Sequence, residues 1–378
     1  MNIFKIKKIM VCLLIVFFVS SCYQKTVVSD DVIAEKSDSM TIENNYIKDE
    51  TTGLPPNTET DLKMIYYEGN ALNIFFHPLV ARPEAAFSSN YKDHFLDWYI
   101  TADEYKKILN ELYMNDYVLV DINELYDVIY SDGAKKVVGK KVLVPEGKKP
   151  LILSIDDLSY YKFVRENASV HKLVIDEKGD IAAWTDGGGL SYDLDVVTIL
   201  EDFIKQRPDF SIRGAKGIIA LTGYEGVLGY QTQVLNAPDY QERAEQAAAV
   251  ADKLKELGWR FASHSYTHWN MAEIPMERFI NCANWWDSQV RIIIGDTDLY
   301  IYPFGAGVEN QAQKHKLLRD RNFNVFFGVG TGFNYFESDE YIFMDRRNID
   351  GIYFKTFRNR QDRLFDIDKV IDDKRTWQ

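Results

Sequence analysis

Two histidines four residues apart are the first candidates for chemistry in this chain, which has six histidines in all. His264 and His268 lie in the stretch G-W-R-F-A-S-H-S-Y-T-H-W-N, residues 258–270. Positions i and i+4 of a helical turn share one face, so both imidazoles could reach a single ion, as in helical two-histidine zinc motifs. The alternative is a pair of surface histidines, and the spacing alone does not decide between the two.

A pair of adjacent aspartates could supply the carboxylate that such a site needs. The run L-I-L-S-I-D-D-L-S-Y-Y, residues 151–161, starts as a buried strand and ends its apolar part at Asp156 and Asp157. Adjacent carboxylates repel each other and are hard to bury unless a cation or hydrogen bonds compensate. A solvated turn is the alternative for this run alone, but aspartates and histidines together favour a metal site.

The N-terminal 22 residues have the pattern of a bacterial secretory signal: three lysines, an apolar run and then small residues. The ending V-S-S-C at Cys22 resembles the lipobox of bacterial lipoproteins, in which the signal is cut before the cysteine and the cysteine is lipidated. We therefore predict a signal peptide at residues 1–21 and a lipid anchor at Cys22. The protein would be held on the cell membrane, facing the extracytoplasmic side; an uncleaved anchor helix is the alternative and gives the same location.

Cysteine content and charge further limit the class of protein to which this chain can belong. Removal of the signal takes away Cys12, lipidation uses Cys22, and Cys282 is left alone, so no intramolecular disulfide is expected. The formal charge of −13 becomes −16 once the three signal lysines are lost. Such an acidic protein is not expected to bind nucleic acid.

Composition divides the rest of the chain in two. Residues 22–61 are rich in Ser, Thr, Asp, Glu and Asn and predict a flexible tether, whereas residues 62–378 are rich in aromatic and β-branched residues and predict one folded body. Expected strands lie at 72–76, 117–121, 150–155, 217–221, 260–262, 299–302, 325–329 and 352–356; expected helices lie at 101–115, 124–130, 193–205, 239–257, from 276, and at 310–321. Residues 172–176 and 181–184 should form a hairpin. Strands that alternate with helices predict a parallel sheet, open or closed as a barrel.

The candidate site residues share one position in this pattern. His77, Asp156, Asp157, His264 and the Pro303-Phe304 pair all follow the carboxyl end of an expected strand. In barrels of alternating strands and helices these ends meet on one face, where active sites lie. We therefore expect these residues to form one site.

The order of these segments resembles the polysaccharide deacetylases of the NodB homology type, carbohydrate esterase family 4, and in particular exported poly-N-acetylglucosamine deacetylase-like lipoproteins. Phe76-His77 corresponds to the end of the family's first strand, S-I-D-D-L at 154–158 to its T-F-D-D-G motif, H-S-Y-T-H at 264–268 to H-[ST]-x-x-H, and I-Y-P-F-G at 301–305 in part to R-P-P-Y-G. The resemblance covers residues 70–360. It implies a distorted (β/α) barrel with a small inserted hairpin.

The resemblance also implies a reaction and assigns roles. Asp157, His264 and His268 would bind a divalent metal, with Zn²⁺ expected, and Asp156 would be the catalytic general base. The metal would polarise an acetamide carbonyl and activate water, and the carboxylate would take the proton. The protein would then be a hydrolase that removes N-acetyl groups from a cell-wall or extracellular polysaccharide containing N-acetylglucosamine.

Substrate-binding residues are expected around this centre. His77, Pro303 and Phe304 would line it from their strand ends. Trp184, Trp269, Trp285 and Trp286 are all able to stack on a sugar, and we expect Trp269 to do so because it follows His268 directly.

Two departures from the family pattern leave a second function open. Ile301 replaces the arginine that orients the base aspartate, and Arg346 or Arg347 in M-D-R-R-N-I-D-G could supply the charge from another strand; Arg347 is the one we assign to the site. The C-terminal histidine that protonates the leaving amine should fall near residues 352–357, which contain none. The alternative is therefore a catalytically degenerate relative that binds a glycan without turnover.

Overall fold

The structure is a computed structural model that describes residues 63–131, 133–185 and 187–377. The predicted signal peptide, the tether and Cys22 lie outside the described residues. Contacts divide the chain into two units, residues 1–57 and 58–378, and the described residues all belong to the second. None of the helices in the described part is both long and apolar enough to cross a bilayer.

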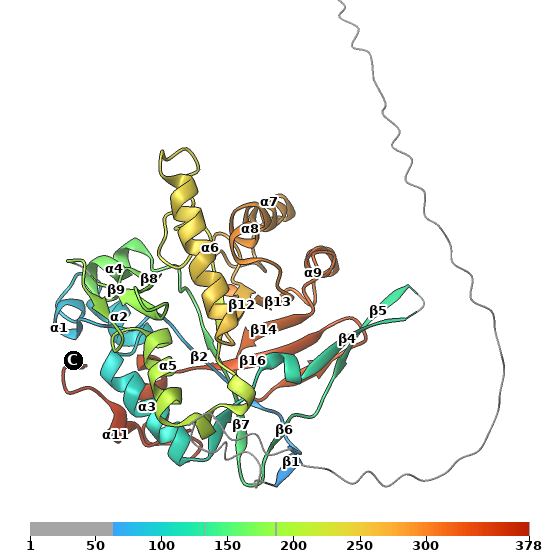
Figure 1. Cartoon of the computed structure of the whole chain (residues 1–378). Coiled ribbons are helices and arrows are strands. Elements are labelled where there is room, and N and C mark those ends of the chain that lie inside the picture. Colours follow the sequence, from blue (N-terminus) through green and yellow to red (C-terminus); the bar gives the residue numbers. More distant parts are fainter. Residues whose placement is uncertain (1–62, 132, 186, 378) are drawn as a thin grey trace, which may run out of the picture. The chain divides into compact units, whose positions relative to one another are not determined.

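Seven parallel strands close into a barrel (Figure 1). Around the barrel the order is β11, β12, β13, β14, β16, β2 and β7, and β7 pairs with β11 to close it. Their bounds are β2 Leu72–Phe76, β7 Lys149–Ile155, β11 Ile218–Leu221, β12 Arg260–Ser263, β13 Leu299–Ile301, β14 Val325–Val329 and β16 Ile342–Asn348. The predicted (β/α) barrel is confirmed.

Further strands extend this sheet or form small sheets of their own. β3 (Tyr117–Leu119) adds to β7, and β15 (Tyr335–Glu337) runs antiparallel to β16. The expected hairpin is present as β8 (Lys172–Ile175) and β9 (Ile181–Trp184). A third strand, β10 (Leu190–Ser191), pairs antiparallel with β9. The other pairs are β1 (Met64–Tyr66) with β6 (Leu143–Pro145), and β4 (Tyr126–Ser131) with β5 (Ala134–Gly139).

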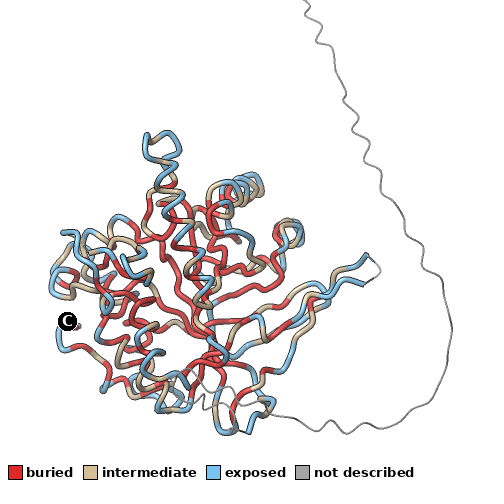
Figure 2. Tube along the Cα trace, viewed as in Figure 1, coloured by how far each residue is buried: buried red, intermediate tan, exposed pale blue. Residues whose placement is uncertain are grey.

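Helices surround the barrel, and their inner faces are buried against its strands (Figures 1 and 2). The longer ones are α3 (Ala102–Met114), α5 (Val196–Gln206), α6 (Tyr240–Glu256), α7 (Met276–Trp286) and α9 (Ala312–Arg319). The shorter ones are α1 (Pro83–Ala86), α2 (Lys92–Trp98), α4 (Lys162–Asn167), α8 (Ile292–Ile294), α10 (Gly351–Phe357) and α11 (Ile367–Val370). α3 begins with the capping box that the sequence predicts, Thr101 with Glu104.

Alternation along each strand separates two apolar layers. In β7, Leu151 and Leu153 face the helices, whereas Ile152 belongs to the cluster that fills the barrel. The barrel interior also takes Ala262 from β12 and Met344 from β16. Because side chains alternate with a period of two, the parity of any barrel residue fixes whether it points inward.

Two of the expected elements are wrong. Residues 124–130 were expected to be helical, but most of them lie in β4, where aromatic and β-branched residues pair antiparallel with β5. Residues 352–356 were expected to be a strand but lie in α10, which Asp350 caps by accepting a hydrogen bond from the Tyr353 N–H at 2.8 Å. The last barrel strand is β16, which was not expected because its sequence D-R-R-N has the polarity of a loop.

Candidate metal centre

Strand parity brings polar residues from four strands into the mouth of the barrel. Asp156 continues the inward-facing series of β7, and His264 that of β12. Arg346 continues the series of β16, and His77 that of β2. All four lie at the carboxyl end of their strands, as the sequence predicts for His77, Asp156 and His264.

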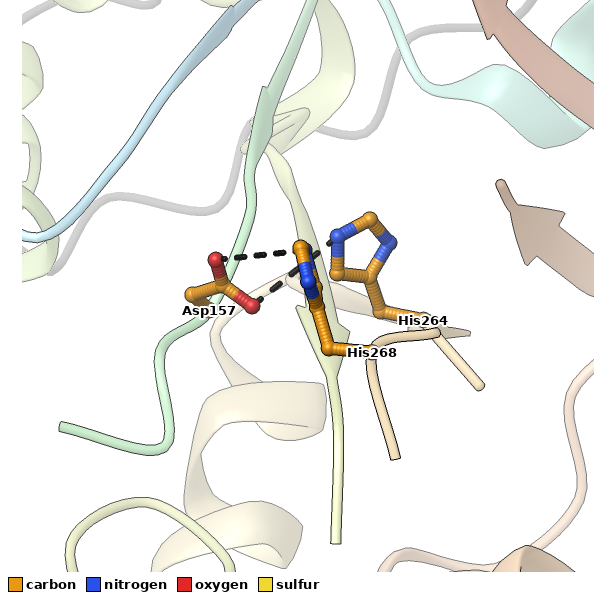
Figure 3. Close-up of side chains that lie close together, drawn as sticks. All are labelled: Asp157, His264 and His268. Carbon is orange, nitrogen blue, oxygen red and sulfur yellow. Dashed lines mark ion pairs between the residues drawn. The ribbon is translucent and has the colours of Figure 1, made fainter. Parts of the chain in front are cut away.

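Asp157, His264 and His268 form the tightest group (Figure 3). Their candidate ligand atoms all lie within 4.8 Å of one another. The Asp157 carboxylate is 3.9 Å from His264 Nε2 and 3.7 Å from His268 Nε2, and the two imidazole centroids are 5.0 Å apart. Asp157 and His264 are buried, and His268 is partly exposed, so the group opens to solvent on one side.

The two histidines meet without the helical turn that their spacing suggested. Residues 264–270 form a loop after β12, and no helix is assigned there. Ser265 and His268 both have positive φ, 56° and 54°, and the His268 N–H donates to Ser265 Oγ at 3.1 Å. The loop, rather than a helix face, turns both rings toward Asp157.

His264 presents Nε2 as a free acceptor. Its Nδ1 lies 2.9 Å from the backbone oxygen of Ile301, and a carbonyl only accepts hydrogen bonds, so the ring proton is on Nδ1. Burial lowers the pKa of His264, although Asp156 and Asp157 oppose the effect. The ring is therefore neutral and has its Nε2 lone pair directed to the centre, as a metal ligand requires.

Asp156 is bound by an arginine from the strand that was not expected. Arg346 Nη1 and Nη2 donate to Oδ1 and Oδ2 of Asp156 at 2.6 and 2.9 Å, and Nη1 also donates to Ser154 Oγ at 2.9 Å. Burial by itself raises the pKa of Asp156, but the charge of Arg346 and the hydrogen bonds that it donates outweigh burial and hold the pKa at about 2. Asp156 is thus an ionised carboxylate in a fixed orientation.

The structure corrects our assignment of Arg347 to the site. It has the opposite parity in β16, and its guanidinium donates to the backbone oxygen of Asp362 at 3.3 Å and lies 5.1 Å from the Phe357 ring. Arg346 holds the site position instead. The sequence narrowed the choice to two neighbours, but only the strand register shows which one faces inward.

Tyr161 contacts the three-residue group, which the sequence did not predict. Its hydroxyl donates to Asp157 Oδ1 and lies 2.8 Å from Thr222 Oγ1, and Thr222 in turn is 3.2 Å from Ser159 Oγ. All of these side chains are buried. The position four residues after Asp157 was the available signal, since it lies in the same D-D-L-S-Y-Y run.

Backbone strain collects at this end of the barrel. Of the nine described non-glycine residues with positive φ, five are Asp157 (60°), Tyr160 (55°), Ser265 (56°), His268 (54°) and Phe304 (59°). Each such residue costs on the order of 1–3 kcal/mol and persists only where the surroundings enforce it, most often at functional sites. The strain is independent support for a site here.

The remaining expected residues lie at different distances from the centre. Phe304 is 68% exposed with its ring 4.7 Å from that of His268, and buried Pro303 precedes it. His77 packs against Tyr99 at 5.4 Å between ring centroids. Trp269 lies 5.6 Å from the Arg278 guanidinium and has no ring contact with the three-residue group among the described contacts.

The donor set fits a divalent cation of the zinc type. Two imidazole nitrogens and one carboxylate oxygen match a catalytic site with an open position, and the neutral state of His264 satisfies the protonation requirement. The buried Asp157 carboxylate has a neutral hydroxyl, not an arginine, as its direct partner. A cation would supply the missing charge.

Comparison with known proteins finds proteins similar to this chain only among solved structures. No protein-family model matches the chain, and no curated protein matches it. The chain is similar to a Bacillus anthracis protein designated a polysaccharide deacetylase (12% identity, 80% of this chain, 69% of that chain, TM-score 0.42) and to a Bacillus cereus polysaccharide deacetylase (12%, 74%, 65%, 0.40). It is also similar to the Streptococcus pyogenes deacetylase PplD in complex with acetate (14%, 75%, 93%, 0.36). At these identities and TM-scores the chemistry has to come from the site itself.

Proposed function

We propose that this protein is a metal-dependent deacetylase that hydrolyses N-acetyl groups of an extracytoplasmic polysaccharide containing N-acetylhexosamine. One observation carries the proposal: the Asp157, His264 and His268 group lies next to a second carboxylate, Asp156, which an arginine holds ionised and oriented. The two adjacent carboxylates then have separate roles. Asp157 is a ligand, and Asp156 is a base.

Asp157, His264 and His268 would hold the ion, and a bound divalent cation supplies Lewis-acid polarisation of an acetamide carbonyl and lowers the pKa of water in the site. Asp156 accepts the proton of the attacking water as the new C–O bond forms. The C–N bond then breaks, acetate leaves, and the nitrogen of the sugar takes a proton. Asp156, which then carries the proton taken from water, is the group placed to return it.

The oxyanion needs a backbone N–H donor that the barrel does not already use. The Tyr302 N–H donates to the backbone oxygen of Phe327 at 3.0 Å and is committed to the barrel. Residue 303 is a proline without an N–H, so Phe304 has the next backbone donor along this segment. Its positive φ brings that segment beside His268.

Cellular location follows from the N-terminal pattern. We propose that the protein is exported and lipid-anchored at Cys22, and that it acts on a cell-wall or extracellular polymer. Growth with labelled palmitate and Cys22→Ser as the control would test the anchor: label on the wild-type protein only is the expected result.

The test of function measures metal content and acetate release on the same samples. We expect about one zinc per chain in the wild-type protein, loss of zinc and activity in His264→Ala, and retained zinc without activity in Asp156→Asn. His171→Ala, which removes a histidine outside the group, is the control for metal content. Absence of metal from the wild-type protein, after reconstitution with zinc, would refute the proposal.

The non-catalytic alternative has one observation in its favour. The last barrel strand, Ile342–Asn348, has no histidine, and neither has the following helix where the family pattern places its acid. Glycan binding with a full complement of metal and no acetate release from any N-acetylated glycan would establish that alternative.

A further inference from the structure

A cavity lies along the connection that follows β7, which begins with Asp156 and Asp157. Its volume is about 350 Å³, within the range of ligand pockets. We call it the Trp184 cavity; the side chains used below are Arg165, His171, Lys172, Trp184, Tyr230 and Arg243. α4, β8 and β9, which supply several of them, are labelled in Figure 1.

Two connections link the cavity to the surroundings of the metal centre. One follows β7 and begins at Asp156, and the other follows β11 and begins at Thr222. The Tyr161 hydroxyl contacts both at the metal end, reaching Asp157 and Thr222. Farther along, the Lys162 N–H donates to Glu225 Oε2 at 2.6 Å, so the two connections stay in contact on the way to the cavity.

Close packing fixes the same two connections at the cavity itself. The Leu173 N–H donates to the Leu228 oxygen at 3.3 Å. Gly229 has φ 89°, and a Cβ on it would lie 2.3 Å from the His171 oxygen. Only glycine allows this approach, so the wall is a built feature.

Two aromatic rings and an ammonium group line one side. Trp184, at the end of β9, is 37% exposed. Lys172 Nζ lies 5.9 Å from the Trp184 ring centroid and 4.6 Å from that of Tyr230. A half-exposed indole beside polar groups is the arrangement that binds a ring with one apolar face and a hydroxyl-bearing edge.

The charges of the cavity are largely compensated from within. Arg165 donates to the Tyr160 oxygen at 2.8 Å and lies 3.7 Å from Glu225, and Arg243 pairs with Asp239 at 2.7 Å. His171 Nε2, by contrast, is buried and has no hydrogen-bond partner among the described residues. These features favour a neutral ligand rich in hydroxyl or amide groups over an anion.

We propose that the Trp184 cavity is a second saccharide subsite, which holds a unit of the N-acetylhexosamine chain away from the unit that is deacetylated. The inference rests on the proposed function for the identity of the polymer. The subsite stacks a sugar on Trp184 and contacts its polar edge with Lys172. It makes the protein selective for long chains over short ones.

The test measures binding without turnover. Calorimetry with β-1,4- and β-1,6-linked N-acetylglucosamine pentamers and dimers is done on Asp156→Asn and on the same protein carrying Trp184→Ala. We expect Trp184→Ala to raise the Kd of the preferred pentamer about tenfold and to leave the Kd of the dimer unchanged. Trp98→Ala is the matched control, because Trp98 is 44% exposed on α2, away from the cavity.

The outcomes separate the subsite from the proposed function. Pentamer binding that depends on Trp184, with no acetate release by the protein that retains Asp156, keeps the subsite and rejects the deacetylase. Acetate release from the pentamer with the same Kd in Trp184→Ala rejects the subsite and keeps the deacetylase. Failure of both pentamers to bind rejects the subsite.

Discussion

Two buried arginine–carboxylate pairs in this molecule look alike and do different things. Arg346 donates two hydrogen bonds to Asp156 in the mouth of the barrel. Arg375 donates two hydrogen bonds of 2.7 Å to Glu104 at the start of α3. In both pairs the guanidinium is bidentate and both side chains are buried. Pair geometry alone therefore does not distinguish a functional site from a structural one.

What differs is the remaining hydrogen-bonding capacity of the carboxylate. Glu104 also accepts the backbone N–H groups of Thr101 and Asp372, and Arg375 donates further to the oxygens of Leu96 and Tyr99, so this pair closes the C-terminal segment onto α2 and α3. For Asp156 no backbone N–H donor to the carboxylate is found among the described residues; its other close neighbour is His264 Nε2 at 3.9 Å. Asp156 can still accept a proton, whereas Glu104 is saturated.

The largest expected effect is on catalysis by the Asp156 pair. Arg346→Met should lower acetate release by about 10²–10⁴, the contribution of a positioned base, because Asp156 loses its fixed orientation and the cation that keeps it ionised in a buried site. Bound zinc should remain. Arg347→Met, its neighbour on the outer face of β16, is the control and should keep activity per folded molecule; equal losses in both variants would mean that the pair has no catalytic role.

Next in size is the stability supplied by the Glu104 pair. Arg375→Met should lower the free energy of unfolding by about 3–5 kcal/mol, because it leaves a buried carboxylate without its partner. Urea denaturation measures the change. Arg360→Met, which breaks an exposed pair with Asp362, is the control and should leave the free energy of unfolding nearly unchanged.

A double variant sharpens this result. Glu104→Gln with Arg375→Met removes the uncompensated charge and should be less destabilised than Arg375→Met alone. If the double variant is worse than the single one, the cost lies in lost packing and not in the buried charge.

A third buried carboxylate, Asp195, shows what happens without an arginine. Burial raises its pKa to about 6, although the Val197 N–H and the Tyr160 hydroxyl stabilise the charge. Between about pH 4 and 6 the folded protein then binds more protons than the unfolded chain, so the free energy of unfolding should fall as pH rises, by about 2 kcal/mol, and level off above pH 6. Asp195→Asn should remove this slope in denaturation curves taken from pH 4 to 7; a slope unchanged in that variant would assign it to other groups.

The smallest expected effect concerns the hydroxyl next to the metal ligand. Tyr161→Phe should raise the Kd for zinc about tenfold, because Asp157 loses the hydrogen bond that orients it. Tyr160→Phe is the matched control, since the Tyr160 hydroxyl bonds to Asp195 at 2.9 Å and not to Asp157. Competition with a chromogenic chelator measures both; equal affinities in the two variants would exclude a positioning role for Tyr161.

Local patterns predicted most of the fold. Apolar runs predicted β2, β7 and β11, and the capping box predicted the start of α3. The turn residues predicted the hairpin at 172–184. The errors fell on segments whose partner decides their state: residues 124–130 pair with β5, and β16 hides charged residues inside a barrel.

The sequence by itself determined which residues carry the chemistry: an aspartate pair at a strand end, two histidines after another strand, and two arginines in a row. Tertiary structure decided how they meet. The loop at 264–268 replaces the expected helical turn, and register in β16 selects Arg346 over Arg347. The physical reason is that residue type is local, whereas the inward or outward direction of a side chain in a closed parallel barrel depends on pairing with strands far away in the sequence.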